Sequence, residues 1–253
     1  MGTVEIIATH TITHKSTTIF VQVVPVGKVT VPKLEIGATH TAALKTDGTV
    51  WTWGSNSYGQ LGTGDNINKA MPAKVMDIEN AIDISVGSYN TVVVKDDGTV
   101  WSFGYNGYGQ LGDGTTVSKN SPTVIKTEKS NLTDIKELKA GSGSSMAIMK
   151  NGDTYTWGSN NNNKLGTTAT KNQIYPTKLE NVNTSISGDI GTDNGGIIDT
   201  QGFVYMWGLG TYGNLGNSLY NTSVEPVLVG AEEAGLDEYD IISVSYTHLR
   251  AHE

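Results

Sequence analysis

The alternation of hydrophobic and polar residues divides the chain into short segments that favour β-strands. In TVWTWG (49–54) the side chains alternate with a period of two, which places Trp51 and Trp53 on one face of a strand. The segments HTAALKT (40–46) and NTVVVKD (90–96) are equally rich in strand-forming residues, and each leads into an Asp-Gly pair. Such pairs favour two-residue type I′ hairpins, because both central residues must adopt a positive φ. The pattern predicts antiparallel strands joined by tight turns.

This arrangement occurs four times along the chain. The copies begin at Gly37, Gly87, Gly141 and Gly191, in steps of 50, 54 and 50 residues. In each copy a turn glycine follows 11 residues after the start, and an aromatic residue that precedes a glycine follows after 16 residues. The unit continues with a Gly- and Asn-rich loop, a stretch that contains a proline, and a last apolar run. Proline suits the start or edge of a strand, because no hydrogen bond of the ladder is lost there. About four strands in roughly 50 residues is the content of one β-propeller blade, so the chain is predicted to be all-β, a partial β-propeller of about four four-stranded blades.

The positions that recur in the copies are interpreted as packing and turn residues. An aromatic stripe that repeats in every unit fills the space between sheets more often than it meets a ligand. The recurring positions are Gly37, His40, Asp47, Gly48, Trp51, Trp53, Gly54, Gln60, Leu61, Gly62, Gly87, Asp97, Gly98, Trp101, Gly104, Gln110, Leu111, Gly112, Gly141, Gly152, Trp157, Gly158, Leu165, Gly166, Gly191, Gly202, Trp207, Gly208, Leu215 and Gly216.

Residues 37–64 match one known pattern nearly position for position. The matching residues include His40, Asp47-Gly48, Trp51, Trp53-Gly54, Asn56 and Gly59-Gln60-Leu61-Gly62. They resemble the regulator of chromosome condensation repeat, and the resemblance covers about residues 32–243, although Asn90 stands at the His position of the second copy. The resemblance implies a β-propeller, usually of seven blades, in which His40 makes a structural hydrogen bond within its blade.

The chain is expected to have three parts. The four blades are assigned to residues 32–80, 81–134, 135–185 and 186–243. Residues 1–31 are expected to be the terminal strands of a preceding bacterial Ig-like module or a linker, because TTIFVQVVPV (17–26) resembles the final strand of such a module; alternatively, this segment is a strand of the propeller itself. Residues 244–253 resemble a translated sequencing-library adapter, so we expect an artefactual tail and a reading frame that continues elsewhere.

Composition narrows the classes of function. The chain has 17 Lys and Arg against 25 Asp and Glu, for a formal net charge of −8. Proteins that hold nucleic-acid phosphates or anionic lipid head groups need clustered Lys and Arg, so neither partner is expected. The lack of Cys excludes disulfides, thiol catalysis and Cys-ligated zinc. No apolar run approaches the roughly 18 residues of a membrane-spanning helix, so no membrane-spanning helix is expected in this sequence.

Two patterns suggest ligand binding but have structural alternatives that we favour. Gly107, Gly109 and Gly112 satisfy G-x-G-x-x-G, yet they lie between predicted strands, whereas dinucleotide binding needs a helix after the motif. His10 and His14 could share a metal ion, but no third ligand recurs at a suitable spacing, and an exposed strand face explains them better.

Oxygen ligands for calcium are a further possibility after the Gly-Gln-Leu-Gly turn. Asp65, Asn66, Asn68 and Asp113 could supply them, although Asp and Asn also cap turns by themselves. The spacings suggest no nucleophile elbow and no isolated pair of carboxylates. We therefore expect no enzyme, no cofactor and no metal.

The loop positions that differ between copies are the candidates for partner contact, because loops on a rigid scaffold commonly carry function. They are Asp65, Asn66, Asn68, Thr115, Thr116, Asn161, Asn162 and Tyr212. We expect a non-catalytic interaction module of a larger bacterial secreted or cell-surface protein, which binds a protein or glycan and no small-molecule substrate. The alternatives are guanine-nucleotide exchange on a small GTPase, which the resemblance implies, and a targeting module of an enzyme whose catalytic domain lies outside this chain.

Overall fold

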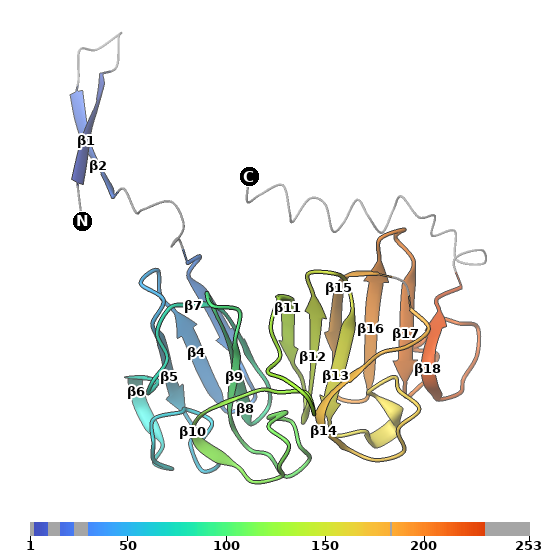
Figure 1. The fold of residues 1–253 in the computed structure, drawn as a ribbon. Coiled ribbons are helices and arrows are strands. Elements are labelled where there is room, and N and C mark those ends of the chain that lie inside the picture. The colour runs from blue at the N-terminus through green and yellow to red at the C-terminus, as the bar shows by residue number, and fades with distance from the viewer. Residues whose placement is uncertain (1–2, 10–15, 23–29, 183, 231–253) are drawn as a thin grey trace.

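Four antiparallel sheets, each of four strands, stand side by side in chain order (Figure 1). The computed structural model describes residues 3–9, 16–22, 30–182 and 184–230. Sheet 1 consists of β3 (Lys33–Ile36), β4 (His40–Leu44), β5 (Val50–Gly54) and β6 (Lys69–Lys74), and sheet 2 of β7 (Ala81–Val86), β8 (Asn90–Lys95), β9 (Val100–Gly104) and β10 (Lys119–Val124). Sheet 3 consists of β11 (Ile135–Ala140), β12 (Ser144–Met149), β13 (Thr154–Gly158) and β14 (Gln173–Lys178), and sheet 4 of β15 (Ser185–Ile190), β16 (Asn194–Asp199), β17 (Val204–Gly208) and β18 (Ser223–Leu228). The all-β prediction with four four-stranded units is confirmed.

A two-stranded sheet lies earlier in the chain. Its strands β1 (Thr3–Thr9) and β2 (Ser16–Gln22) pair antiparallel, with Thr3 opposite Gln22. The β-like runs predicted there do contain strands, and their assignment to an Ig-like module stays a prediction. His10, His14 and residues 244–253 lie outside the described residues.

The hairpins between the second and third strands differ from the predicted type I′ turn. Gly48 has a φ of 75°, but Asp47 is not among the residues with positive φ. The Asp47 carboxylate instead accepts hydrogen bonds from the Thr49 N–H at 3.0 Å and the Thr49 hydroxyl at 2.6 Å. This side-chain bond holds a three-residue loop that ends in a left-handed glycine. Asp97 makes the same bonds to Thr99, so the two-residue prediction was wrong.

Hydrophobic side chains form a separate core at each contact between neighbouring sheets. Val93 and Phe103 of sheet 2 pack with Ala42 and Leu44 of sheet 1. The next core joins sheets 2 and 3 around Trp157. The third core joins sheets 3 and 4 around Met146, Ile197 and Trp207. Each sheet is thus stabilised by its neighbours, as in other repeat architectures.

The outermost strand of each sheet carries a proline. The four are Pro72, Pro122, Pro176 and Pro226, in β6, β10, β14 and β18, each of which pairs with a single neighbouring strand. Next to each proline the pairing register shifts. The prediction that these prolines occupy strand edges is confirmed.

Helix is nearly absent from the part of the chain that the structure describes. The one helical element there is η1 (Asn161–Asn163), a short 3₁₀ turn between β13 and β14. None of the described helices is long and apolar enough to cross a membrane.

Candidate functional site

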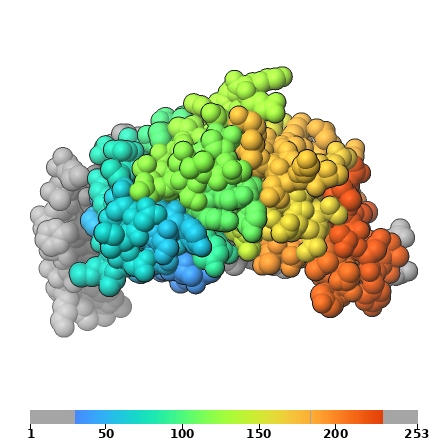
Figure 2. All heavy atoms as spheres, turned by 90° about the horizontal axis from the view of Figure 1, so that it is seen from below, coloured from blue at the N-terminus to red at the C-terminus, as the bar shows by residue number. Residues whose placement is uncertain are grey.

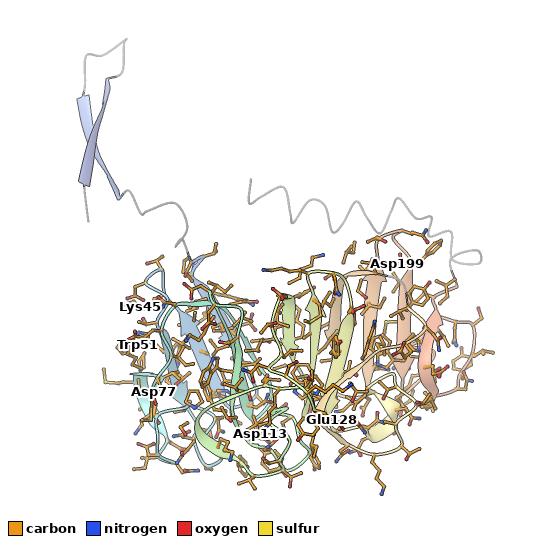
Figure 3. All side chains as sticks on the ribbon, in the orientation of Figure 1. Lys45, Trp51, Asp77, Asp113, Glu128 and Asp199 are labelled. Atoms are coloured by element: carbon orange, nitrogen blue, oxygen red, sulfur yellow. The ribbon has the colours of Figure 1, made fainter. Side chains whose placement is uncertain are left out.

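The long connections between the third and fourth strands gather at one end of the sheets. They are residues 55–68, 105–118, 159–172 and 209–222, and they are called here the long-loop end. Figure 2 views the molecule from this side, where the loops of neighbouring sheets make a continuous surface. Asp113 lies at this end, and Asp199 lies at the opposite end (Figure 3).

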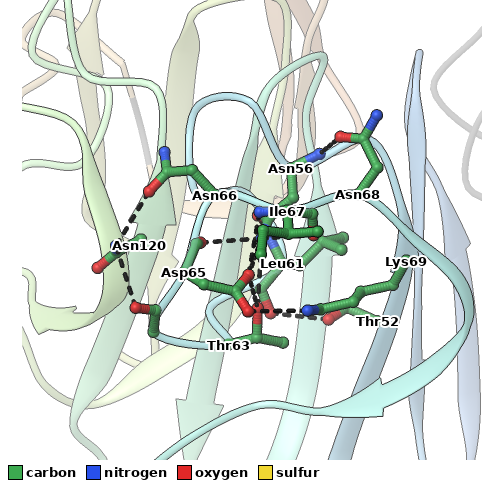
Figure 4. A network of polar contacts seen from close by, with 11 residues as sticks. Thr52, Asn56, Leu61, Thr63, Asp65, Asn66, Ile67, Asn68, Lys69 and Asn120 are labelled. Atoms are coloured by element: carbon green, nitrogen blue, oxygen red, sulfur yellow. Dashed lines mark hydrogen bonds and ion pairs between the residues drawn. The ribbon is translucent and has the colours of Figure 1, made fainter.

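A buried asparagine organises each of the first three long loops. The Asn56 side-chain oxygen accepts a hydrogen bond from the Leu61 N–H at 2.9 Å, and its amide donates to the Asp65 carbonyl at 2.9 Å (Figure 4). Asn106 and Asn160 make the same bond to the Leu111 and Leu165 N–H groups, at 2.9 and 3.0 Å. One amide side chain therefore closes a loop of more than ten residues and makes it rigid.

Three of the predicted partner residues, Asp65, Asn66 and Asn68, make hydrogen bonds in and around the first long loop (Figure 4), although Asn66 and Asn68 are exposed. One Asp65 carboxylate oxygen accepts from the Asn56 amide at 3.0 Å, and the other lies 2.8 Å from the Lys69 ammonium. Hydrogen bonds from Lys69, followed by the Ile67 N–H and Thr63, lower the pKa of Asp65 to about 2. The Asn68 side-chain oxygen accepts from the Asn56 N–H at 2.7 Å.

Asn66 joins two sheets. Its amide donates to the Ser57 carbonyl at 3.1 Å, and its oxygen accepts from the Asn120 amide at 3.0 Å, at the start of the outer strand of sheet 2. The Gly64 N–H adds a 2.8 Å bond to the Asn120 carbonyl. Asn66 therefore contributes to the contact between sheets 1 and 2.

The second and third loops place their predicted residues differently. Asp113 is buried, and its carboxylate accepts from the Thr115 N–H at 2.9 Å and the Thr115 hydroxyl at 2.8 Å, whereas Thr116 is exposed. Asn161 is exposed in η1, and the Asn162 amide donates to an Asp193 carboxylate oxygen at 2.9 Å.

The fourth loop holds one predicted residue, Tyr212. The Tyr212 side chain is 84% exposed. Among the described residues, no three His, Cys, Asp or Glu side chains come together in a way that could hold a metal ion. The G-x-G-x-x-G run at residues 107–112 lies in the loop between β9 and β10 and is not followed by a helix.

His40 makes its side-chain hydrogen bond to the neighbouring sheet. Its Nε2 lies 2.8 Å from the Thr91 hydroxyl in β8, so the expectation of a hydrogen bond within one blade was wrong. Burial lowers the pKa of His40 to about 4. The imidazole is therefore neutral at pH 7 and serves packing between sheets 1 and 2.

A cluster of four tyrosines at the long-loop end was missed by the sequence analysis. We call Tyr58, Tyr89, Tyr105 and Tyr108 the tyrosine cluster. The Tyr105 ring centroid lies 4.9 Å from that of Tyr58 and 5.7 Å from that of Tyr108, and Tyr58 lies 5.6 Å from Tyr89. Tyr58, Tyr89 and Tyr108 are 41–43% exposed. Burial, followed by the neighbouring Tyr108 and Tyr58, raises the pKa of Tyr105.

The tyrosine cluster has a sequence signal that is visible once the copies are aligned. Tyr58 and Tyr108 occupy the same repeat position, which is Asn162 in the third copy and Tyr212 in the fourth. Tyr89 and Tyr105 occur in the second copy alone, where the other copies have no aromatic residue. The four rings meet because sheets 1 and 2 are neighbours.

Comparison with known proteins agrees with this architecture. Residues 6–248 match the RCC1-like domain, a match that includes much of the segment expected to precede the propeller. The E3 ubiquitin-protein ligase HERC2 of Homo sapiens is 30% identical over 213 residues, which cover 83% of this chain and 4% of HERC2. The ultraviolet-B receptor UVR8 of Arabidopsis thaliana is 30% identical over 188 residues, which cover 72% of this chain and 42% of the receptor.

Solved structures show the same fold. Yeast RCC1 (Prp20), in a crystal structure with Kap60 bound, superposes with a TM-score of 0.71 at 20% identity, over 86% of this chain and 52% of that one. Human WBSCR16 gives a TM-score of 0.69 at 21% identity, over 81% of this chain and 53% of the other. The chain therefore spans about half the length of these structures, and less of the curated relatives.

Proposed function

The chain belongs to the RCC1-like domain family, and on that basis we propose that it is a non-catalytic interaction module that binds a protein partner at its long-loop end. The observation that carries this proposal is the tyrosine cluster. Tyrosine gives a large contact area with few rotatable bonds and a hydroxyl at its tip, and it is enriched at protein interfaces. Three half-exposed rings on neighbouring loops form a surface of that kind.

The loops beneath the cluster favour binding because they are already ordered. Asn56 and Asn106 close the two long loops that carry Tyr58, Tyr105 and Tyr108. A surface that is rigid before it binds loses less conformational entropy on association. The tyrosine cluster is thus held in place by the same asparagines that define the repeat.

Two further observations support a protein as the partner class. The structure of yeast RCC1 contains bound Kap60, and a second structure of Prp20p is described together with its binding to Gsp1p and histones. Those partners belong to the yeast protein; for this chain they support the class of partner and not its identity. The absence of catalytic activity is proposed because the recurring residues serve packing and turns.

The cellular location is a proposal from sequence alone. We propose an extracellular or cell-surface location on a bacterium, supported by the resemblance of residues 17–26 to a bacterial Ig-like strand. A screen of surface-exposed and secreted proteins is therefore the first place to seek the partner.

The experiment compares two variants on a protein microarray. The double variant Tyr58→Ser/Tyr108→Ser removes two half-exposed rings of the cluster, and Met71→Ser removes a 77% exposed side chain of β6, outside the long-loop end. We expect a partner bound by the unaltered chain to lose about tenfold or more in affinity with the double variant and to be unaffected by the control.

Three results would contradict the proposal. A partner that binds both variants equally well places the binding surface elsewhere. A chain that binds a glycan array and no protein makes the partner a sugar. Accelerated nucleotide release from a small GTPase, measured in parallel, would make the chain an exchange factor.

A further inference from the structure

The segments that form the tyrosine cluster are built from five residue types alone. They contain Ser, Tyr, Gly, Asn and Gln, and no Asp, Glu, Lys, Arg or His. These segments, with the turn of sheet 3 beside Tyr108, are residues 55–60, 87–90, 104–110 and 141–144. The binding loops of antibodies have a similar composition, in which Tyr supplies rigid contact area and Ser, Gly and Asn supply small polar contacts. The segments of the cluster therefore offer a partner rings and neutral polar groups, but no charge.

The cluster arises from a contact that recurs at each junction between neighbouring sheets. The residue at the tip of a long loop meets the turn between the first two strands of the next sheet. In the first junction the Tyr58 ring centroid lies 5.6 Å from that of Tyr89. In the second, a Cβ atom on Gly143 would lie 3.3 Å from the Tyr108 ring, and in the third an amide and a carboxylate meet. The aromatic form of the contact is thus confined to the first two junctions.

The exposure of these rings belongs to the repeat position. Tyr108 lies in sheet 2, which has a neighbouring sheet on both sides, and it is 41% exposed. Tyr58, at the same position of sheet 1, is 43% exposed. Because a ring between two sheets is as open as the ring of the first sheet, the neighbouring loops leave this surface free for a partner.

The spacing of the rings fits an extended segment. The Tyr58 and Tyr108 rings both contact Tyr105, at centroid distances of 4.9 and 5.7 Å and with interplanar angles of 60° and 82°. Their own separation therefore cannot exceed the sum of these two distances, and one turn of a polyproline II helix, ~9 Å, is of this size. Two residues that are three positions apart in such a helix can meet the two rings together.

The hydroxyl groups of the cluster favour a partner with free carbonyls. None of the described residues makes a hydrogen bond with the hydroxyl of Tyr58 or of Tyr89. The Tyr58 and Tyr108 backbone N–H groups already donate to Gln60 and Gln110, both at 3.0 Å. A polyproline II segment has no internal hydrogen bonds, so its carbonyls are free to accept, and each proline lacks an N–H that would need an acceptor.

The lack of charge argues against an acidic or basic segment as the partner. A charged group that is buried on this surface would lose its hydration without gaining an opposite charge. The Lys164 ammonium donates to the Ser142 carbonyl beside the cluster at 2.6 Å, but Lys164 is 3% exposed and cannot pair with a partner's charge. The surface therefore favours an uncharged segment.

We propose that the tyrosine cluster binds an uncharged, proline-rich segment of the protein partner in the polyproline II conformation. This inference rests on the proposed function, because it takes the cluster as the binding surface. Prolines three positions apart stack on the Tyr58 and Tyr108 rings, and tyrosine hydroxyls donate to the carbonyls between them. Aromatic surfaces of other recognition domains receive such segments, and a segment that is already extended loses less entropy on binding.

The first experiment selects peptides without a prior choice of sequence. The full 253-residue chain is exposed to phage that display random peptides of about nine residues, three turns of the helix. We expect the retained peptides to be enriched in prolines three positions apart, with no charged residue between them. Selection on Tyr58→Ser/Tyr108→Ser should lose these peptides, and selection on Met71→Ser, which alters an exposed side chain of β6, should retain them.

Affinities of one enriched peptide test the separate parts of the contact. Replacement of its two spaced prolines by alanine should raise the dissociation constant about tenfold or more. Tyr58→Phe keeps the ring without the hydroxyl and should raise it about twofold to tenfold. The affinity should change less than about twofold between about 50 and about 500 mM sodium chloride, since salt screens charged pairs. Circular dichroism confirms that each variant is folded.

Three results would overturn this inference and leave the proposed function standing, provided that a microarray partner still depends on the cluster. They are retained peptides that are charged and bind less tightly in salt, retained peptides without spaced prolines, and no retained peptides. Proline-containing peptides that bind the double variant unchanged would also overturn the inference. A microarray partner that binds the double variant as tightly as the unaltered chain contradicts the proposed function itself.

Discussion

Trp157 and Trp53 occupy the same position in two copies of one repeat, yet their surroundings differ. Trp157 is 0% exposed, with sheet 2 covering its ring and the Gln110 carbonyl accepting its indole N–H. Trp53 is partly exposed, because none of the described residues covers it in the same way. The repeat thus specifies half of an interface, and the preceding sheet determines whether the residue is buried. Three pairs of substitutions and one single substitution test how far neighbouring sheets determine stability.

The largest difference is expected between the two tryptophans themselves. Trp157→Ala removes a buried ring and leaves a cavity between sheets 2 and 3, which costs about 3–5 kcal/mol of unfolding free energy. Trp53→Ala should cost about 1–2 kcal/mol at a concentration where the chain is monomeric, because less area leaves the water on folding. Urea titrations of both variants measure the difference. Equal losses would mean that Trp53 is already covered.

The turn glycines separate backbone strain from the contact with the next sheet. Gly112→Ala and Gly216→Ala both impose a side chain at a φ of 63°, which costs about 1–2 kcal/mol in each case. Both methyl groups meet the residue after the fourth strand, Ile125 at 2.9 Å or Val229 at 3.0 Å, but Gly112→Ala also places its methyl group 2.9 Å from Trp157 of the next sheet. This additional overpacking should cost about 1–3 kcal/mol. Differential scanning calorimetry should give a lower unfolding temperature for Gly112→Ala. The reverse order would place a covering sheet at Gly216.

The long loops permit a comparison of a buried and an exposed amide. Asn106→Ala leaves the buried Leu111 N–H without its acceptor, at a cost of about 1–3 kcal/mol. Asn66→Ala removes exposed bonds to Ser57 and Asn120 and should change stability by about 0.5 kcal/mol or less. Urea titrations and hydrogen exchange at Leu111 report both effects. A larger loss for Asn66→Ala would show that the bond between sheets, and not the closure of the loop, determines stability.

The smallest effect at neutral pH is expected at His40. Its pKa in the folded state is lowered to about 4 from an ordinary value of 6.5, so the unfolded chain binds more protons between these values. Stability from this group is therefore complete above pH 6.5 and decreases as the pH falls toward 4. His40→Asn introduces the residue that the second copy has at this position, Asn90. In this variant the thermal unfolding temperature should depend less on pH between pH 6.5 and 4. An unchanged slope would exclude His40 as its source.

The fold was predictable from the sequence because its signals are local and occur four times. The strands could be identified without knowledge of their neighbours, from side chains that alternate with a period of two, from turn glycines and from edge prolines. The type of hairpin was not predictable from the Asp-Gly pair, since the Asp47 carboxylate bonds to Thr49 and offers the backbone another turn.

The candidate site was predicted less well, because it depends on which sheets lie together. Asp65, Asn66 and Asn68 were selected for their variation between copies; their hydrogen bonds, which organise one loop and its neighbour, had no signal in the sequence, and their contact with a partner stays a prediction. Tyr89 and Tyr105 become part of a cluster only when the first sheet brings Tyr58 next to them. A residue's neighbours across a junction are about 50 positions away in sequence and leave no local pattern.

The prolines of the outer strands have a consequence for how the molecule avoids amyloid-like growth. A free sheet edge is a template onto which a strand from any other chain can add through backbone hydrogen bonds. Pro72, Pro122, Pro176 and Pro226 remove one donor from each outer edge, next to a shift in register that interrupts the ladder. The outer edges of the four sheets therefore resist indiscriminate strand addition.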